Sequence, residues 1–345
     1  MGRRGRGARG DTRALIAAAI VGIAAIEPVR ADPIYGLAVN DASDVDFPKA
    51  LLEAKRAGFT STVLPVFWDD VMKDGEYDPD LDWPAIAAAV YPASGFRLAL
   101  VLPVIDTVAD RRPPELRDLE WDDPALLAAF SDFASGVLSR LGRTDLVSIS
   151  IGNEVDAYLT GEDWAAYQRF FSAARAEVAR LRPGVPVGVN LTWGGLTGPD
   201  AAAARALAER GDVWLVTYYG LDAGFRIRPP EEVAGAIDSM VAMAGEQPLI
   251  LAEVGYPSDG CGSDEDGQLK FYKTLLAVLK DREAEVTVAN IVWMHDISED
   301  QLDTYRTYYG TDDDCFARYL GSLGLRARDG ADKPAFAWIR GQLGN

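Results

Sequence analysis

Apolar and polar positions along the chain follow two periods, one typical of buried strands and one typical of amphipathic helices. Eight short runs are almost continuously apolar, as expected for strands that are covered on both faces of a parallel sheet. The predicted strands are Ile34–Asn40, Thr60–Trp68, Arg97–Ile105, Leu146–Asn153, Val187–Leu191, Val213–Tyr219, Leu249–Glu253 and Thr287–Trp293.

Ala-rich segments with helical periodicity lie between these runs. Several begin after an Asp or at a Pro, which is typical of helix starts, and several end at a Gly. The predicted helices are Pro48–Ala57, Trp83–Val90, Pro124–Leu141, Glu162–Arg182, Asp200–Arg210, Pro230–Ala244, Asp264–Asp281 and Lys333–Leu343. Eight strand–helix units without a Ser/Gly-rich linker predict the α/β class and a single (β/α)8 TIM barrel over residues 32–345. A doubly wound open sheet is the alternative, although no glycine-rich phosphate-binding motif follows the first strand.

The first 31 residues have the pattern of a secretory signal peptide. Five arginines precede the 13-residue apolar stretch Ala14–Ile26, and Val29 and Ala31 suit the −3 and −1 positions of a cleavage site. Thirteen residues are too few to span a bilayer. We therefore expect cleavage after Ala31 and a secreted or periplasmic protein, with an uncleaved N-terminal anchor as the alternative.

Charge narrows the range of partners. The chain carries 34 basic and 53 acidic residues, and loss of residues 1–31, with six arginines and two acids, would change the net charge from −19 to −23. Such a surface repels nucleic acid and anionic membranes and favours neutral or cationic substrates. We expect a monomer that binds no nucleic acid and is not inserted in a membrane after cleavage.

Two predicted strands lead directly into a glutamate. Glu154 follows Leu146–Asn153, and Glu253 ends Leu249–Glu253. A carboxylate at the end of an apolar strand is costly to desolvate, so it indicates either function or a structural ion pair. The 99-residue separation fits three βα units of about 33 residues each, which places the glutamates on strands four and seven. Both would then lie at the C-terminal face of the barrel, and two facing carboxylates are what glycoside hydrolysis requires.

Aromatic residues recur at or near the ends of the predicted strands. Trp68, Trp193 and Trp293 are examples, and His295 follows the last of them. Aromatic rings match the flat C–H faces of sugars, so we predict that these four residues bind substrate. Packing in the barrel core is the alternative for each aromatic ring, and a hydrogen-bonded structural role is the alternative for His295.

The segments around the two glutamates resemble known active-site motifs. Gly152-Asn153-Glu154-Val155 and Glu253-Val-Gly-Tyr-Pro-Ser258 are similar to the two signatures of retaining β-glycosidases with (β/α)8 barrels. The closest resemblance is to glycoside hydrolase family 17, the β-1,3-glucanases, whose second motif reads E-T-G-W-P-S. Val254 and Tyr256 depart from that motif, so the superfamily is better supported than the family or its substrate.

The resemblance implies a role for each glutamate. Glu253 is expected to attack the anomeric carbon, while Glu154 protonates the leaving oxygen and then activates water. This mechanism predicts that the two carboxyl groups lie about 5–5.5 Å apart.

Further residues near the motifs receive roles from the same resemblance. Asn153 is expected to bond the sugar 2-hydroxyl, and Trp293 to form the floor of the subsite that holds the reacting sugar. Tyr218 or Tyr219 is expected to orient Glu253. Strand alternation turns only one of the two inward, and of the two we favour Tyr218.

The chain contains two cysteines, Cys261 and Cys315, both expected in loops after strands seven and eight. Export to an oxidising compartment predicts a disulfide between them, with two separately buried thiols as the alternative. Two Cys and His295 cannot complete a tetrahedral zinc site without carboxylates, so we expect no metal and no cofactor.

The sequence thus predicts a secreted retaining β-glycosidase that acts on a β-linked, β-glucan-type oligosaccharide or polysaccharide. A transglycosylase with the same residues and a non-catalytic carbohydrate-binding barrel are the alternatives. The sequence leaves open the sugar, the linkage, and endo or exo action.

Overall fold

A computed structural model describes residues 33–43, 45–73, 75–78, 82–222 and 224–344. The predicted signal peptide lies outside the described residues, so its cleavage after Ala31 stays a prediction.

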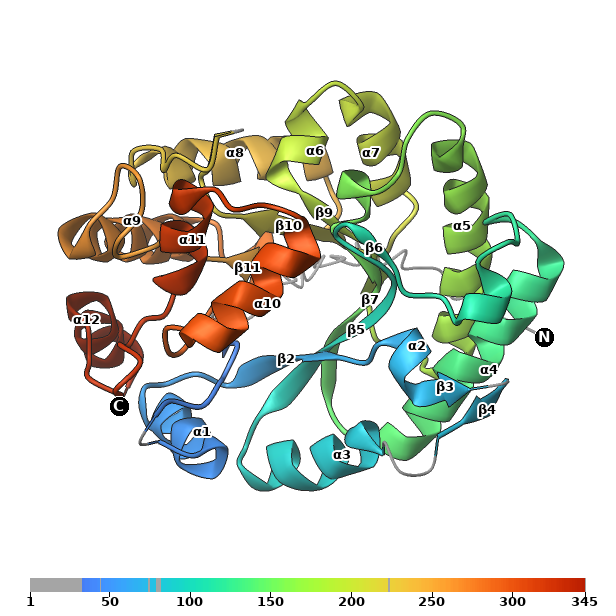
Figure 1. Ribbon diagram of the computed structural model, residues 1–345, viewed down its shortest axis with the longest axis horizontal. Helices are drawn as coiled ribbons and strands as arrows, with labels where there is room; N and C mark the ends of the chain where they lie inside the picture. Colours follow the sequence, from blue (N-terminus) through green and yellow to red (C-terminus); the bar gives the residue numbers. More distant parts are fainter. Residues whose placement is uncertain (1–32, 44, 74, 79–81, 223, 345) are drawn as a thin grey trace, which may run out of the picture. The chain divides into compact units, whose positions relative to one another are not determined.

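A ring of parallel strands surrounded by helices forms the protein (Figure 1). The strands are β1 (Ile34–Leu37), β2 (Ser61–Pro65), β5 (Arg97–Asp106), β7 (Leu146–Asn153), β8 (Val187–Gly188), β9 (Asn190–Thr192), β10 (Trp214–Tyr218), β11 (Leu249–Val254) and β12 (Val286–Ile291). β8 and β9 are two pieces of the fifth strand, separated by Val189. Since β8 pairs with β7 and β9 pairs with β10, the fifth strand completes the ring. The (β/α)8 barrel is therefore confirmed, and the doubly wound alternative is wrong.

One helix of the outer layer follows each strand of the ring. These helices are α1 (Phe47–Arg56), α3 (Trp83–Ala93), α4 (Pro124–Leu141), α5 (Asp163–Leu181), α7 (Ala201–Ala208), α8 (Glu232–Ala244), α9 (Glu265–Asp281) and α12 (Pro334–Leu343). Of the acids expected at helix starts, Asp82 and Asp123 accept hydrogen bonds from backbone N–H groups in the first turns of α3 and α4, whereas the Asp200 side chain makes no such bond at the start of α7. Asp264 caps α9 in the same way as Asp82 and Asp123.

Short elements lie between the strands of the ring and the helices that follow them. They are α2 (Trp68–Val71), the β3–β4 hairpin (Met72–Lys73 and Glu76–Tyr77), β6 (Ala109–Asp110), the 3-10 turns Pro114–Leu116 and Val155–Ala157, and α6 (Trp193–Thr197).

Two helices between the eighth strand and α12 were not predicted. α10 (Glu299–Tyr309) lies across the front of the barrel in Figure 1, and α11 (Asp314–Gly321) lies beside it. Leu302 is the buried residue of α10, so this helix lacks the apolar stripe that identifies a helix from sequence. A usable signal was present at its start, where Ser298 and Gln301 form a capping box.

The core has two layers. Large apolar side chains between the ring and the helices form the main cluster, which includes Leu98 and Leu100 of β5. Ala99 lies between these two and belongs to a smaller cluster, so strand alternation places that cluster inside the ring. Its buried members are Ala99, Val147, Val213, Leu215, Ile250 and Val288.

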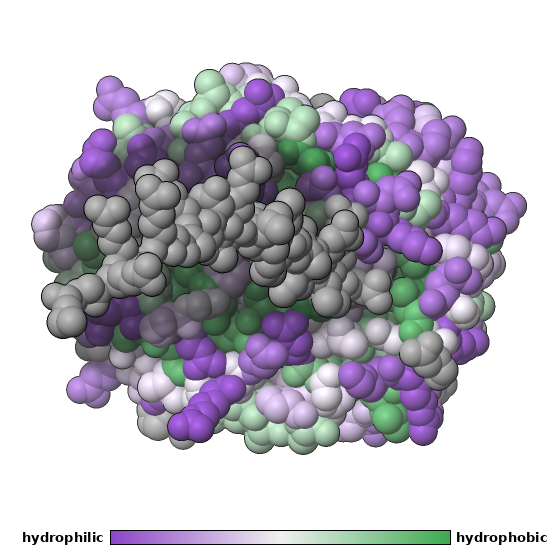
Figure 2. Space-filling model, turned by 180° about the vertical axis from the view of Figure 1, so that it is seen from behind, coloured by the Kyte–Doolittle hydropathy of each residue, from purple (hydrophilic) through white to green (hydrophobic). Residues whose placement is uncertain are grey.

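The side opposite to the view of Figure 1 has a mostly hydrophilic periphery, with hydrophobic residues nearer the middle (Figure 2). Within the described ranges, no helix has both the length and the apolar character needed to cross a bilayer.

Candidate active site

A cavity of about 1350 Å³ lies at the C-terminal ends of the barrel strands. Seven residues predicted from the sequence line it together: Asn153, Glu154, Trp193, Tyr218, Tyr219, Glu253 and Trp293. β7 and β11 are the fourth and seventh strands of the ring, so the placement of the two glutamates agrees with their spacing in sequence.

Glu154 directly follows β7 and is only 9% exposed. Its backbone is left-handed, with φ 46°, and so is that of Thr107, with φ 47°, although neither residue is a glycine. The Thr107 hydroxyl donates a hydrogen bond of 2.9 Å to Glu154 Oε2. Two strained residues joined by one hydrogen bond are typical of a site whose geometry the surrounding fold imposes.

The surroundings of Glu154 favour its neutral form. Burial, followed by the negative charge of Glu253, raises the pKa of Glu154 to about 8, and the hydrogen bond from Thr107 opposes this rise. Glu154 therefore keeps its proton at neutral pH, which is the state that a general acid requires.

Glu253 lies near the end of β11 and accepts a hydrogen bond of 2.5 Å from the Tyr219 hydroxyl at Oε2. Burial raises the pKa of Glu253, whereas the bond from Tyr219 lowers it by stabilising the carboxylate. Since the two glutamates repel each other when both are charged, the pair holds one proton, and this proton resides on Glu154. Glu253 is then a charged carboxylate held by a tyrosine, as a nucleophile should be.

The preference for Tyr218 as the partner of Glu253 was wrong. Thr217 points inward and exchanges hydrogen bonds with Asn190, so strand alternation turns Tyr218 outward and Tyr219 inward again. The Tyr218 ring instead stacks on Phe271 of α9, with ring centroids 6.4 Å apart, although residue 218 also belongs to the cavity lining.

Trp68 does not bind in the cavity. Its side chain is 1% exposed and stacks on Phe133 of α4 with ring centroids 5.3 Å apart. The start of α2 at Trp68 turns this ring into the core, whereas the preceding Phe67 lines the cavity.

His295 is also not a substrate-binding residue. It is fully buried, its Nδ1 lies 2.8 Å from the Asn40 carbonyl oxygen, and its Nε2 lies 3.3 Å from an Arg326 nitrogen. Nδ1 must donate to the carbonyl and Nε2 must accept from the guanidinium, which describes a neutral imidazole. Burial lowers the pKa of His295, in agreement with this structural role.

Aromatic residues that the sequence reasoning missed form part of the cavity wall. Trp293 stacks on Tyr305 of α10 with ring centroids 5.8 Å apart, and the Tyr305 ring stacks in turn on Tyr309. Further members of this wall are Tyr308, Phe316 and Tyr319. The Tyr-rich segment 305–309 was visible in the sequence, but no predicted strand end pointed to it.

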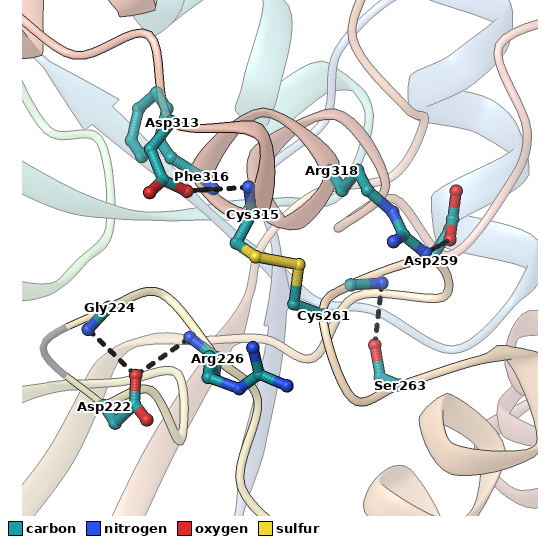
Figure 3. Close-up of a disulfide and its surroundings, with 11 residues drawn as sticks. Asp222, Gly224, Arg226, Asp259, Cys261, Ser263, Asp313, Cys315, Phe316 and Arg318 are labelled. Atoms are coloured by element: carbon teal, nitrogen blue, oxygen red, sulfur yellow. Dashed lines mark hydrogen bonds and ion pairs between the residues drawn. A yellow bond between two sulfur atoms is a disulfide. The ribbon is translucent and has the colours of Figure 1, made fainter.

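The predicted disulfide between Cys261 and Cys315 is present, with a sulfur–sulfur distance of 1.98 Å (Figure 3). Cys315 belongs to the first turn of α11 and not to a loop as expected, because Asp313 caps that turn through its N–H groups. An ion pair between Arg318 and Asp259 flanks the bridge. The loop after β11 is therefore joined to α11 at two points, close to the cavity wall.

The described parts of the chain contain no group of three or more His, Cys, Asp or Glu side chains arranged to hold an ion.

Comparison with solved structures shows the same barrel fold in other proteins. No family model and no curated protein matches the chain. A GH5_18 variant from Streptomyces cattleya in complex with Manβ1-4GlcNAc matches 90% of this chain and 80% of its own, with TM-score 0.70 and 15% identity. GH5_18 from Bifidobacterium longum gives TM-score 0.72 at 15% identity, covering 90% and 79% of the two chains.

The exo-β-1,4-mannosidase Op5Man5 from Opitutaceae bacterium strain TAV5 gives TM-score 0.69 at 16% identity, and the match covers 90% of this chain but 58% of that one. Identities this low establish the barrel fold alone. The resemblance to family 17 is not confirmed by these comparisons.

Proposed function

We propose that this protein is a retaining β-glycosidase that acts by double displacement. The observation that carries the proposal is the asymmetric carboxyl pair that lines one cavity at the barrel mouth: burial and the charge of Glu253 raise the pKa of Glu154, whereas Glu253 accepts a hydrogen bond from Tyr219 that stabilises its charged form. Each group has the protonation state that its role requires before the reaction begins.

In the first step, Glu253 Oε attacks the anomeric carbon as the glycosidic C–O bond breaks. The Glu154 proton passes to the departing oxygen, so the products are a glycosyl ester on Glu253 and a neutral alcohol. In the second step, the Glu154 carboxylate takes a proton from water while the water oxygen attacks the same carbon. The ester bond breaks, and Glu253 becomes a carboxylate again.

The change of charge on Glu253 explains how one residue can serve as acid and then as base. While Glu253 is charged, it raises the pKa of Glu154. The ester has no charge, so this contribution disappears in the intermediate and Glu154 becomes a stronger acid. It therefore stays ionised long enough to accept a proton from water.

The cavity wall suits a neutral sugar. Trp193 and Trp293 present rings to the cavity, which fits the stacking of sugar C–H faces. The neighbour in complex with Manβ1-4GlcNAc and the exo-β-1,4-mannosidase support a β-linked mannoside as substrate, and a β-glucosidase with the same fold supports a β-linked glucoside. We propose a β-linked oligosaccharide with one of these sugars at the reacting position.

The test is a screen of aryl β-glycosides and natural β-mannans, β-glucans, galactans and xylans. The first-formed anomer is then followed by NMR before mutarotation. Retention is expected, and inversion would contradict the proposal. Glu154→Ala should lose least activity on aryl glycosides with good leaving groups, and azide should restore their turnover as a glycosyl azide. Sugar-transfer products that dominate over hydrolysis would identify a transglycosylase.

We further propose that the protein is exported and begins at Asp32. The basic and apolar N-terminal segment supports this proposal. Intact-mass analysis of the exported protein tests it, and a mass that includes Met1 to Ala31 would contradict it and favour an anchored form.

A further inference from the structure

The side-chain amide of Asn153 is held in one orientation by two neighbours. Its Oδ1 accepts a hydrogen bond of 2.6 Å from Asn190 Nδ2, and its Nδ2 donates a hydrogen bond of 2.9 Å to Asp106 Oδ1. Because the Asn190 amide nitrogen can only donate, the side of the Asn153 amide that faces it must be the oxygen, and the side that faces Asp106 must be the nitrogen. That nitrogen carries two hydrogens, and Asp106 takes one of them, which leaves a second for a ligand in the cavity.

The backbone places Asp106 beside Asn153. The two residues are register partners at the ends of β5 and β7, after a shift in the pairing between Leu102 and Asp106. The next residue, Thr107, donates its N–H to the Asn153 carbonyl over 2.9 Å and its hydroxyl to Glu154. The end of β5 thus supports both members of the Asn153–Glu154 pair.

Asp106 is itself held from the opposite side by Tyr308 of α10. The Tyr308 hydroxyl lies 2.8 Å from Asp106 Oδ2 and also contacts the Asp106 carbonyl oxygen. Asp106 and Tyr308 both line the cavity and are 202 positions apart in the chain. Helix α10 therefore reaches from the eighth strand across to the third and contacts the group that orients Asn153.

We propose that Asp106 is a positioning residue that aims the Asn153 N–H at the 2-hydroxyl of the reacting sugar, and that Tyr308 holds Asp106 in place from α10. This inference rests on the proposed glycosidase function. It assigns α10 a part in catalysis beyond forming the cavity wall. Tyr308 of this helix holds Asp106, Asp106 holds the Asn153 amide, and the amide bonds the sugar.

The inference predicts an effect confined to one hydroxyl group of the substrate. Without Asp106, the Asn153 amide can rotate and present its oxygen or no donor at all. Hydrogen bonds to the sugar 2-hydroxyl strengthen in the transition state, so their loss should lower kcat more than it raises KM. A 2-deoxy sugar has no such hydroxyl, so its turnover should not depend on the orientation of the amide.

The experiment compares the full-length enzyme with Asp106→Ala, Asp106→Asn and Tyr308→Phe on paired aryl β-glycosides, one with and one without the 2-hydroxyl. Asp106→Ala should lower kcat/KM by about 10- to 100-fold on the 2-hydroxy substrate and by less than about threefold on the 2-deoxy substrate. Asp106→Asn keeps an oxygen acceptor for Asn153 and should retain more activity. Tyr308→Phe should show the same selective loss at a smaller size.

Thr307→Ala serves as the control, because Thr307 is exposed on the same helix and its hydroxyl bonds only within the helix, to the Asp303 carbonyl. It should leave both substrates unaffected. An active wild type in which Asp106→Ala slows both substrates equally would overturn the inference and leave the glycosidase function standing. A wild type without activity on any glycoside would overturn the proposed function and the inference with it.

Discussion

Replacement of the acid/base residue should stabilise the protein at alkaline pH. Glu154 is 9% exposed, and burial together with Glu253 raises its pKa from an ordinary value of 4.5 to about 8. The folded state therefore holds this proton more tightly than the unfolded state does. The contribution of this proton to the free energy of unfolding is fully present below about pH 4.5, and it is lost as the pH rises through about 8.

The magnitude follows from the difference between the two pKa values. One pKa unit equals about 1.4 kcal/mol, so ionising Glu154 in the folded state costs on the order of 5 kcal/mol. Glu154→Gln has no charge to develop, and its side-chain oxygen can still accept the Thr107 hydrogen bond. At pH 8.5 the variant should melt on the order of 10 °C above the wild type, whereas at pH 4.5 the two should melt together.

The assay is differential scanning calorimetry of both proteins from pH 4.5 to 8.5. Glu177→Gln is the matched control, because the hydrogen bond from Arg180 lowers the pKa of Glu177 and so predicts no gain at alkaline pH. A Glu154→Gln variant that melts below the wild type at pH 8.5, or that differs from it by the same amount at every pH, would refute this reasoning.

Three further changes test other parts of the structure. Tyr219→Phe should lower kcat/KM by about 10- to 100-fold. It should also move the acidic limb of the pH profile to higher pH, because the hydrogen bond from Tyr219 lowers the pKa of Glu253 and the variant lacks that bond. An acidic limb at the same pH as in the wild type would contradict this. Replacing Cys261 and Cys315 with serine should cost roughly 3–5 kcal/mol of stability on the loop-entropy model, and unchanged melting would count against it. Trp68→Ala should destabilise the protein by about 3–5 kcal/mol without changing KM at temperatures where the variant is folded. An altered KM would indicate that Trp68 takes part in substrate binding.

The sequence was informative wherever local pattern and tertiary position coincide. β7 and β11 are buried on both faces, so their apolar runs are visible without a structure, and the glutamates at their ends stand out as costly charges. Asp82 and Asp123 similarly act through N–H groups two or three residues away. Such features depend on contacts within one segment, which a sequence displays directly.

The features that were missed depend on contacts between distant segments. α10 buries little apolar surface of its own, and its place over the cavity is set by the Trp293 stack and the disulfide of α11. The bond from Tyr308 to Asp106 joins helix α10 to the end of strand β5, so no local sequence pattern indicates it. His295 resembles a site residue because it follows a strand, yet its partner Arg326 lies on a segment that returns from α11.

Double displacement requires a covalent bond between Glu253 and the sugar. Incubation with the 2-deoxy-2-fluoro glycosyl fluoride of the preferred sugar should trap this intermediate, because fluorine slows both steps and fluoride is a good leaving group. Mass spectrometry of the digested protein is predicted to find one fluorosugar on the peptide that carries Glu253. A label on any other residue, or turnover of the natural substrate with inversion and no label at all, would contradict the account.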